Sequence, residues 1–220
     1  MGVVKRILIV VAIAMAAVTV SAKDRGGLWG QRASLFELLP VDSTDIVFLG
    51  NSITHYCEWH ELLGMQNVKN RGISGDVVDG FYDRLEPVVK GHPRKIFVMG
   101  GINDISHKLS ADSVATLMAN LLDYIIENTP TTEIFLQSAL PINNDFNRFK
   151  SLTGTEQIVI DYNRRLEQLA EERGITFINL FPLFANEEGK LDPIYTNDGL
   201  HLLGNAYIKW RDYILPYVNR

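Results

Sequence analysis

The sequence has only one cysteine, Cys57, so no disulfide can form within the chain. Stability must then come from a packed core, and a small buried side chain is the favoured interpretation of Cys57 over a nucleophilic thiol. Positive charge is also scarce, because 21 Lys and Arg residues stand against 26 Asp and Glu residues. Without a basic stripe, the composition indicates neither nucleic acid nor an anionic membrane surface as a partner.

Long apolar runs are absent except at the N-terminus. There, Lys5 and Arg6 precede an apolar run over residues 7–20, and small residues ending at Ala22 fit a cleavage site. At about 14 residues, this run is shorter than the roughly 20 that a membrane-spanning helix needs. We therefore expect residues 1–22 to be the signal peptide of a secreted or periplasmic protein, with no stable membrane insertion after its removal.

The remaining residues, 23–220, have a length that suits one domain with a sizeable core. No internal repeat or low-complexity segment divides them. Loss of Lys5 and Arg6 with the leader would change the formal net charge from −5 to −7. We predict a single acidic domain, whose oligomeric state the sequence does not specify.

Five short apolar, β-rich runs alternate with segments of helical periodicity, and this alternation predicts the fold. Strands that alternate with helices form right-handed βαβ units, whose parallel sheet is covered by helices on both faces. We therefore predict an α/β fold, a three-layer α/β/α sandwich around a five-stranded parallel sheet. The expected strands are residues 46–49, 68–70, 96–99, 133–137 and 176–180.

Apolar residues recur at intervals of three and four in several segments, which predicts helices. Ser74 and Asp76 can cap one such helix over residues 77–88, and Ser110 or Ser113 opens another over residues 114–125. Further helices are expected over residues 28–39, 155–173 and 203–217.

Polar residues gather just after the predicted strands, where an open parallel sheet binds its ligands. Ser52 lies in the turn Gly50-Asn51-Ser52-Ile53-Thr54 after the first strand. Gly72 follows the second strand and Asn103 the third, while Asp198 and His201 lie in a loop beyond the fifth. Because the carboxyl ends of parallel strands share one edge, we expect these residues to meet.

These residue types suit acyl transfer by a serine nucleophile. Ser52 needs a base, and the three-residue spacing of Asp198 and His201 lets a carboxylate hold one imidazole nitrogen while the other faces the serine. A developing oxyanion needs hydrogen-bond donors. The backbone N–H groups of Ser52 and Gly72 and the side-chain amide of Asn103 are the expected donors.

Four sequence blocks resemble those of the GDSL-type, or SGNH, esterases and acetylhydrolases. The blocks are Gly50-Asn51-Ser52-Ile53, Gly72, Gly101-Ile102-Asn103-Asp104 and Asp198-Gly199-Leu200-His201, and the resemblance spans residues 45–204. It implies a flavodoxin-like fold and serine ester hydrolysis without a metal or other cofactor. By this resemblance, Ser52 is the nucleophile, His201 the general base, Asp198 its orienting partner, and Gly72 and Asn103 the oxyanion donors.

The chain departs from the family pattern at two positions, where Asn51 and Ile53 replace Asp and Leu. Neither position takes part in proton transfer, and Asn can make the same local turn hydrogen bonds. Thr54 occupies the place of the last glycine of Gly-x-Ser-x-Gly, which disfavours the nucleophile elbow of an α/β-hydrolase.

A second Asp-x-x-His pair, Asp104 and His107, also follows a strand and keeps open an alternative base. A metal site built from Asp104, His107, Asp198 and His201 is a weaker alternative, since no established ligand spacing supports it.

We expect an exported serine esterase that hydrolyses short acyl groups, above all O-acetyl esters on carbohydrates, through an acyl-enzyme on Ser52. Trp59, Asn143 and Asn144 are the candidate sugar-binding residues, with His60 beside Trp59 as a further pocket residue. A lysophospholipase or thioesterase of the same family remains an alternative. So does a non-catalytic, flavodoxin-like carbohydrate-binding domain.

Overall fold

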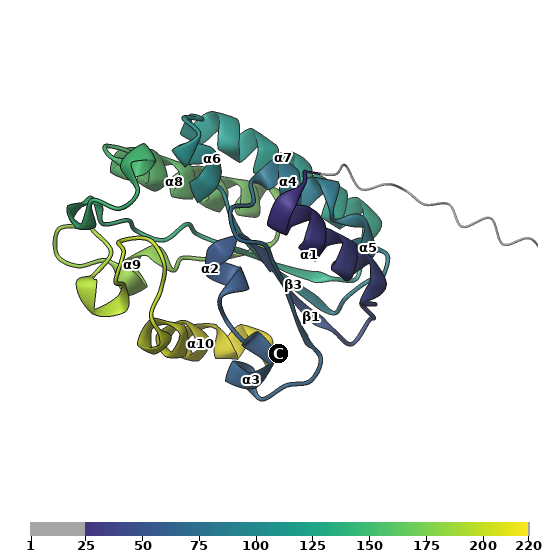
Figure 1. The fold of residues 1–220 in the computed structure, drawn as a ribbon. Helices are drawn as coiled ribbons and strands as arrows, with labels where there is room; N and C mark the ends of the chain where they lie inside the picture. The colour runs from purple at the N-terminus through teal and green to yellow at the C-terminus, as the bar shows by residue number, and fades with distance from the viewer. Residues whose placement is uncertain (1–24, 220) are drawn as a thin grey trace, which may run out of the picture.

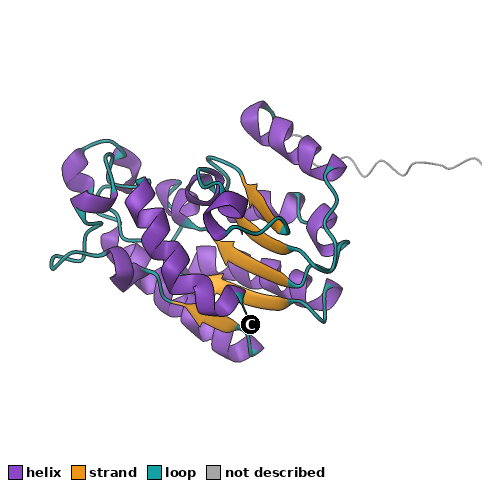
Figure 2. Ribbon diagram, turned by 90° about the horizontal axis from the view of Figure 1, so that it is seen from below, coloured by secondary structure: helices purple, strands orange, loops and turns teal. Residues whose placement is uncertain are grey.

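The computed structural model describes residues 25–219, so the expected signal peptide lies outside the described residues. Five parallel strands form one sheet in the order β2-β1-β3-β4-β5, which confirms the predicted α/β fold (Figure 2). The strands are β1 (Ile46–Gly50), β2 (Val68–Gly72), β3 (Lys95–Met99), β4 (Glu133–Gln137) and β5 (Thr176–Ile178).

Helices cover both faces of the sheet, as right-handed connections require (Figure 1). One face carries the helices that lead from β2 through to β5: α4 (Val78–Asp83), α5 (Glu86–Val89), α6 (Ile102–Ser106), α7 (Ala111–Asn128) and α8 (Glu156–Arg173). The other carries α2 (Ser52–His55), α3 (Trp59–Leu63) and α10 (Gly204–Val218). The short helix α9 (Phe181–Phe184) follows β5, and α1 (Gly27–Leu38) precedes β1.

The core is built on the central strands, whose buried aromatic side chains lie in register. Phe48 of β1 pairs with Phe97 of β3, which pairs with Phe135 of β4, and the rings stack at centroid distances of 4.8 and 4.6 Å. Trp59 of α3 continues this stack, 4.1 Å from Phe48. Such large apolar contact areas hold the layer that contains α3 on the sheet without cross-links.

The order of the strands places the functional edge. The connection after β1 runs toward β2, and the connection after the neighbouring strand β3 runs toward β4. The two connections therefore diverge at the carboxyl ends of these strands. A crevice forms at such a switch point, and ligands bind there in flavodoxin-like sheets. Ser52 follows β1 directly, and Asn103 lies in α6 just after β3.

The expected helix over residues 77–88 was wrong in two respects. It is two short helices, α4 and α5, because Arg84 leaves helical geometry with φ −118° and turns its side chain into the core. Its N-cap is Val77, without a side-chain cap, since Ser74 instead contacts Tyr56 and Asp76 binds Arg84. Of the two candidate caps of α7, Ser110 holds that position and its side chain accepts from the backbone N–H of Ser113.

The long connection after β4 contains two single 3-10 turns, Asn144–Phe146 and Lys150–Leu152. It lies beside the loop that carries Gly199, because the backbone N–H of Asn143 donates to the Gly199 carbonyl at 2.8 Å. Between residues 25 and 219, no helix combines the length and apolarity needed to cross a membrane.

Candidate active site

Ser52 lies at the start of α2, in a turn that only a glycine before it permits. A Cβ on Gly50 would lie 2.1 Å from Thr54 Oγ1 and 2.8 Å from the Met99 carbonyl oxygen. Asn51 caps α2, its Oδ1 accepting from the backbone N–H of Ile53 at 3.0 Å. The turn is therefore held tightly, and Ser52 itself is only 5% exposed.

The imidazole of His201 lies between the Ser52 hydroxyl and the Asp198 carboxylate. Nε2 of His201 is 2.9 Å from Ser52 Oγ, and Nδ1 is 2.7 Å from Asp198 Oδ2. In the neutral tautomer with a proton on Nδ1, this ring donates to Asp198 and leaves Nε2 to accept from the serine. The arrangement has the geometry of a Ser-His-Asp triad.

Asp198 is held by its own loop. Its Oδ1 accepts from the backbone N–H groups of Leu200 and His201 at 2.9 and 2.8 Å. Partial burial acts to raise the pKa of Asp198, but the hydrogen bonds from His201 and Leu200 outweigh it and lower the pKa below its ordinary value. The carboxylate is therefore charged at neutral pH, as a group that orients imidazolium must be.

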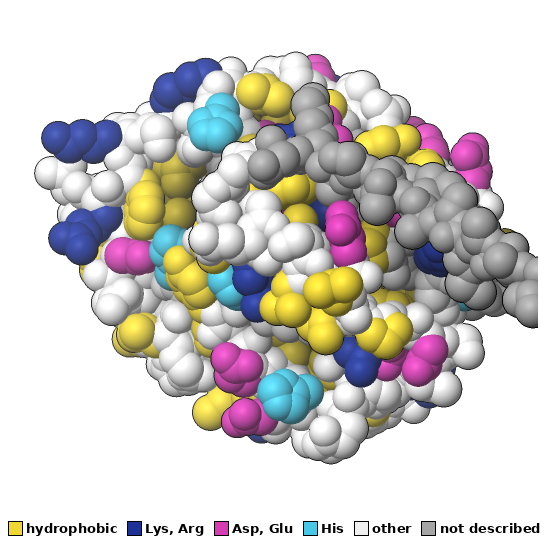
Figure 3. Space-filling model, turned by 45° about the vertical axis from the view of Figure 1, so that its right-hand side comes forward, with side chains coloured by type: hydrophobic (Ala, Val, Ile, Leu, Met, Phe, Trp, Pro, Cys, Tyr) yellow, Lys and Arg dark blue, Asp and Glu magenta, His cyan; other side chains and the backbone are white. Residues whose placement is uncertain are grey.

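Two aromatic rings flank His201. The Tyr56 ring centroid is 5.2 Å from that of His201, and the Phe149 centroid is 5.5 Å away in an edge contact. Tyr56 is 54% exposed, and its hydroxyl is 3.0 Å from Ser74 Oγ. Figure 3 shows histidine and hydrophobic side chains next to one another on one face of the molecule.

Sequence reasoning did not single out either ring. Tyr56 lies in the aromatic stretch directly after the serine turn, and Phe149 in the long loop after β4. These positions were the sequence features that could have indicated a place for each ring in the site.

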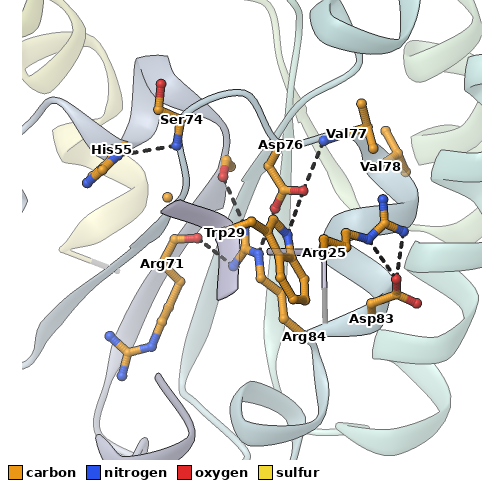
Figure 4. Close-up of polar contacts among 12 residues, drawn as sticks. Arg25, Trp29, His55, Arg71, Ser74, Asp76, Val77, Val78, Asp83 and Arg84 are labelled. Atoms are coloured by element: carbon orange, nitrogen blue, oxygen red, sulfur yellow. Dashed lines mark hydrogen bonds and ion pairs between the residues drawn. The ribbon is translucent and has the colours of Figure 1, made fainter. Parts of the chain in front are cut away.

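His55, the neighbour of Tyr56, faces the same loop. Its Nδ1 accepts from the backbone N–H of Ser74 at 3.2 Å (Figure 4). Burial, together with the charges of Arg32 and Arg84, lowers the pKa of His55 in spite of an opposing effect of Glu58. A neutral imidazole here keeps Nδ1 available as an acceptor and so fixes the loop that begins at Ser74.

Two of the expected oxyanion donors lie at the crevice. The backbone N–H of Ser52 is in the first turn of α2 and, among the described residues, has no hydrogen-bond acceptor. Asn103 donates one amide hydrogen to the backbone carbonyl of Asp76 at 2.7 Å, which leaves its second hydrogen for a ligand.

The assignment of Gly72 as an oxyanion donor was wrong. Its N–H donates to Asn70 Oδ1 at 2.8 Å, so it is already engaged within the protein. A Cβ on Gly72 would lie 2.4 Å from the backbone nitrogen of His55. The glycine is there because β2 ends in close contact with α2.

Gly75, three residues later, offers the N–H that Gly72 does not. It is exposed, has a left-handed φ of 80°, and a Cβ added to it would meet nothing within 4 Å. No residue in the range 25–219 accepts a hydrogen bond from its N–H. Sequence reasoning named this glycine only as a turn residue, since spacing alone does not separate it from Gly72.

Trp59 and Asn143 are not sugar-binding residues. The Trp59 side chain is fully buried, and its Nε1 donates to the Thr54 carbonyl at 3.0 Å. Asn143 is 5% exposed, and its amide spans Leu191 and Asp145 at 2.9 and 3.1 Å. Both side chains complete buried polar contacts, which takes precedence over binding from outside.

Asn144 is half-buried, and its amide donates to the Leu152 carbonyl and to Glu156. These contacts anchor the loop over residues 141–154 to α8. Because its amide nitrogen already donates in these two contacts, the prediction of Asn144 as a sugar-binding residue is not supported. His60 is partly exposed and lies 3.7 Å from Glu61.

The alternative base and nucleophile lie apart from this arrangement. His107 is exposed at the end of α6, whereas His201 is the imidazole in contact with Ser52. Burial raises the pKa of Asp104 to about 6, in spite of a hydrogen bond from the backbone N–H of Val78. Burial also raises the pKa of Cys57 to about 12, so its thiol is protonated and a poor nucleophile. Across residues 25–219, no three His, Cys, Asp or Glu side chains are grouped as metal ligands.

The active-site residues lie within a segment that matches a known protein family. The model of the GDSL-like lipase/acylhydrolase family matches residues 48–207, which include Ser52, Gly75, Asn103, Asp198 and His201.

Two relatives in the sequence comparison have established names. Platelet-activating factor acetylhydrolase IB subunit alpha1 of Bos taurus is 26% identical over 191 residues, which cover 81% of this chain and 78% of the relative. N-acylneuraminate cytidylyltransferase of Escherichia coli strain RS218 is 24% identical over 167 residues, or 74% of this chain. The chain spans only 38% of the length of that second relative.

Solved structures show the same fold. A GDSL-like lipase from Bacteroides thetaiotaomicron superposes with a TM-score of 0.76 at 24% identity, covering 87% of this chain and 97% of its own. An acetyl xylan esterase superposes with a TM-score of 0.65 at 20% identity, covering 79% and 99%. At these identities the likeness establishes the architecture.

Proposed function

Because the chain belongs to the GDSL-like lipase/acylhydrolase family, whose members are ester hydrolases, we propose that it is a serine esterase that removes acetyl and similarly short acyl groups from carbohydrates. One observation carries the proposal: His201 lies within hydrogen-bonding distance of both the Ser52 hydroxyl and the Asp198 carboxylate. Such an arrangement activates a hydroxyl that is otherwise a weak nucleophile.

In the first half of the reaction, His201 Nε2 takes the proton of Ser52 as Oγ bonds to the ester carbonyl carbon. The negative charge that develops on the carbonyl oxygen is bound by the N–H groups of Ser52 and Gly75 and by the Asn103 amide. The tetrahedral intermediate then releases the alcohol, which leaves with the proton from His201. Asp198 stabilises the imidazolium in between.

In the second half, His201 takes a proton from a water molecule as the water oxygen attacks the acyl carbonyl carbon. The same three donors bind the second oxyanion. When the intermediate collapses, the bond to Ser52 Oγ breaks and the serine regains its proton from His201. The carboxylic acid departs, and the enzyme returns to its starting state.

A narrow cavity lined by sequence neighbours of Ser52, Asn103 and His201 supports a short acyl group. Its volume is about 10 Å³, room for about one water-sized sphere. Ile53 follows the nucleophile, Ile102 precedes Asn103 and Leu200 precedes His201, so the sequence neighbours of all three reacting residues line the cavity. The remaining lining residues are Asn51, Met99, Gly100, Ala139 and Leu140. An acetyl methyl group fits such a space, and a long acyl chain does not.

The alcohol side of the site supports a carbohydrate. The exposed face of Tyr56 beside His201 is a platform on which a sugar ring can stack, and its hydroxyl can hydrogen-bond. The fold is shared with an acetyl xylan esterase. A second candidate, the acetyl ester of a phospholipid, is favoured by the likeness to platelet-activating factor acetylhydrolase.

Acetate release distinguishes these candidates. Acetylated xylo-oligosaccharides should be turned over faster than long-chain lysophospholipids, acyl thioesters or an acetylated ether phospholipid. If any of the lipids or thioesters is the better substrate, the carbohydrate assignment fails. Equal, slow hydrolysis of p-nitrophenyl acetate by the wild type and by the variants Ser52→Ala and His201→Ala would instead indicate a non-catalytic binding domain.

We further propose that the protein is exported. The support is the basic start and the apolar run over residues 7–20. N-terminal sequencing of protein recovered from the periplasm or the medium should begin at Lys23. A mature chain that retains Met1 in the cytoplasm would contradict export.

A further inference from the structure

The N-terminal helix α1 reaches the active-site loop through Trp29. Its Nε1 donates to Oδ1 of Asp76 at 2.9 Å, and both side chains are buried (Figure 4). Apolar contacts of α1 with Ile73, in the same loop, involve Trp29, Ala33 and Phe36. A helix that precedes the sheet in sequence therefore contacts the loop that follows β2.

The Asp76 carboxylate also binds Arg84, whose Nε donates to Oδ2 at 2.7 Å. The Arg84 guanidinium continues to the backbone carbonyls of Arg71 and Gly50 at 2.8 and 3.0 Å. It therefore joins the ends of β2 and β1, the latter directly before the serine turn. A buried ion pair persists only when its remaining hydrogen bonds are satisfied, and here Trp29 supplies one of them.

The backbone of Asp76 faces the oxyanion donors. Its carbonyl accepts from Asn103 Nδ2 at 2.7 Å, and its N–H donates to the Ile73 carbonyl at 3.2 Å across Gly75. The position of Asp76 therefore determines where the second hydrogen of the Asn103 amide points. It also determines where the N–H of Gly75 lies.

Gly80 in α4 leaves the space in which this contact forms. A Cβ at that position would lie 1.7 Å from Asp76 Oδ1 and 3.1 Å from Trp29 Nε1. A glycine inside a helix costs stability relative to alanine. Its presence here is explained by the close approach of Trp29 and Asp76.

We propose that Trp29 is a positioning residue for the oxyanion hole, acting through Asp76 on Asn103. Trp29 lies outside residues 48–207, the segment that matches the family model. In this chain, helix α1 would therefore support the active site from outside the matched segment. The proposal rests on the proposed esterase function.

The test is the full chain with Trp29→Phe, which keeps an aromatic ring at this position and removes the N–H donor together with part of the indole volume. Because small displacements of aligned groups have large kinetic effects, we expect kcat for p-nitrophenyl acetate to fall about 10-fold, with KM changed less than about twofold. Leu35→Ala is the control on the same helix, since the Leu35 side chain is 40% exposed and the variant leaves intact Phe36, whose ring lies beside the Arg84 guanidinium. Its kcat should stay within about twofold of the wild type.

A double-mutant cycle separates positioning from general loosening of the fold. If Trp29 acts through Asn103, then Trp29→Phe should change kcat less than about twofold in an Asn103→Ala background. An equal loss in both backgrounds would overturn the proposal. Gly80→Ala provides a second, steric route to the same contact, and it should lower kcat in the same way.

The kinetic results distinguish failure of the Trp29 proposal from failure of the proposed esterase function. If the wild type and Ser52→Ala hydrolyse the ester equally slowly, the proposed function is wrong. If the wild type is active, Ser52→Ala is inactive and Trp29→Phe retains full kcat, the esterase stands and the role of Trp29 is refuted. Melting temperatures of all variants identify any that fail to fold, and Gly80→Ala then serves in place of Trp29→Phe.

Discussion

His201 Nε2 lies 2.9 Å from Ser52 Oγ, although 149 residues separate the two in the chain. The contact exists because β1 and the loop after β5 end at the same edge of one parallel sheet. Each partner is then held locally, Ser52 by the cap of α2 and His201 by the carboxylate of Asp198. Catalysis requires that the two side chains be held in this position, and not only that a serine and a histidine be present.

Asp198→Asn should lower kcat for p-nitrophenyl acetate about 10⁴-fold, because an amide favours the wrong imidazole tautomer and leaves the imidazolium unstabilised. Initial rates at saturating substrate provide the measurement. Asp192→Asn is the control, since Asp192 caps a neighbouring 3-10 turn and is not bonded to His201. A loss of less than about 10-fold in Asp198→Asn would contradict the role of Asp198.

Asn103→Ala should lower kcat about 10²- to 10³-fold with little change in KM, as expected for a donor that binds the transition state more strongly than the substrate. The companion Asn70→Ala removes the acceptor of the Gly72 N–H, together with the amide that donates to the Thr54, His55 and Cys57 carbonyls, so only a gain in kcat would speak for Gly72. If Gly72 takes no part in catalysis, freeing its N–H should not raise kcat. Steady-state kinetics on the two variants measure both effects.

Leu140→Ala enlarges the cavity that Ile53 and Ile102 also line, and it should shift acyl-chain preference. We expect the ratio of kcat/KM for p-nitrophenyl butyrate to that for the acetate to rise about 10-fold, because two added methylenes gain room. The variant should also lose about 2–4 kcal/mol of unfolding free energy. Leu122→Ala, in the buried face of α7, should lose similar stability and leave the ratio unchanged.

Asp104→Asn should change how stability depends on pH. Burial raises the pKa of Asp104 to about 6, so the folded protein holds this proton more tightly than the unfolded chain, whose Asp pKa is about 3.9. The stability of the wild type should therefore fall, relative to the variant, as the pH rises from about 4 to about 6. Urea unfolding at several pH values measures the difference, which should reach at most about 3 kcal/mol. A difference independent of pH would show that folding does not shift the pKa of Asp104.

The strands illustrate what sequence patterns predict well. Short β-rich runs separated by helical periodicity place all five strands, since burial on both faces requires continuous apolar residues. Only their ends moved: β2 continues to Gly72 through polar residues that bond to the neighbouring strand, and β5 ends at Ile178.

The helix over residues 77–88 and the side chain of Trp59 illustrate what such patterns do not decide. Arg84 interrupts the helix because its guanidinium has acceptors on two strands and on Asp76. Trp59 stands near Ser52 in sequence but stacks on Phe48 in the core. Both outcomes depend on partners that are distant along the chain.

The sequence by itself determined the alternation of strands and helices, because periodicity is a local property. It also determined that polar residues lie at one edge of the sheet, because parallel strands share the edge at which their carboxyl ends lie. Tertiary structure alone decided which N–H groups remain free for an oxyanion and which aromatic rings face solvent. A donor such as the Gly72 N–H is available only if no other side chain accepts from it, and Asn70 does. Exposure and hydrogen-bond partnership are properties of the packed molecule, and so is the contact through which Trp29 reaches Asp76.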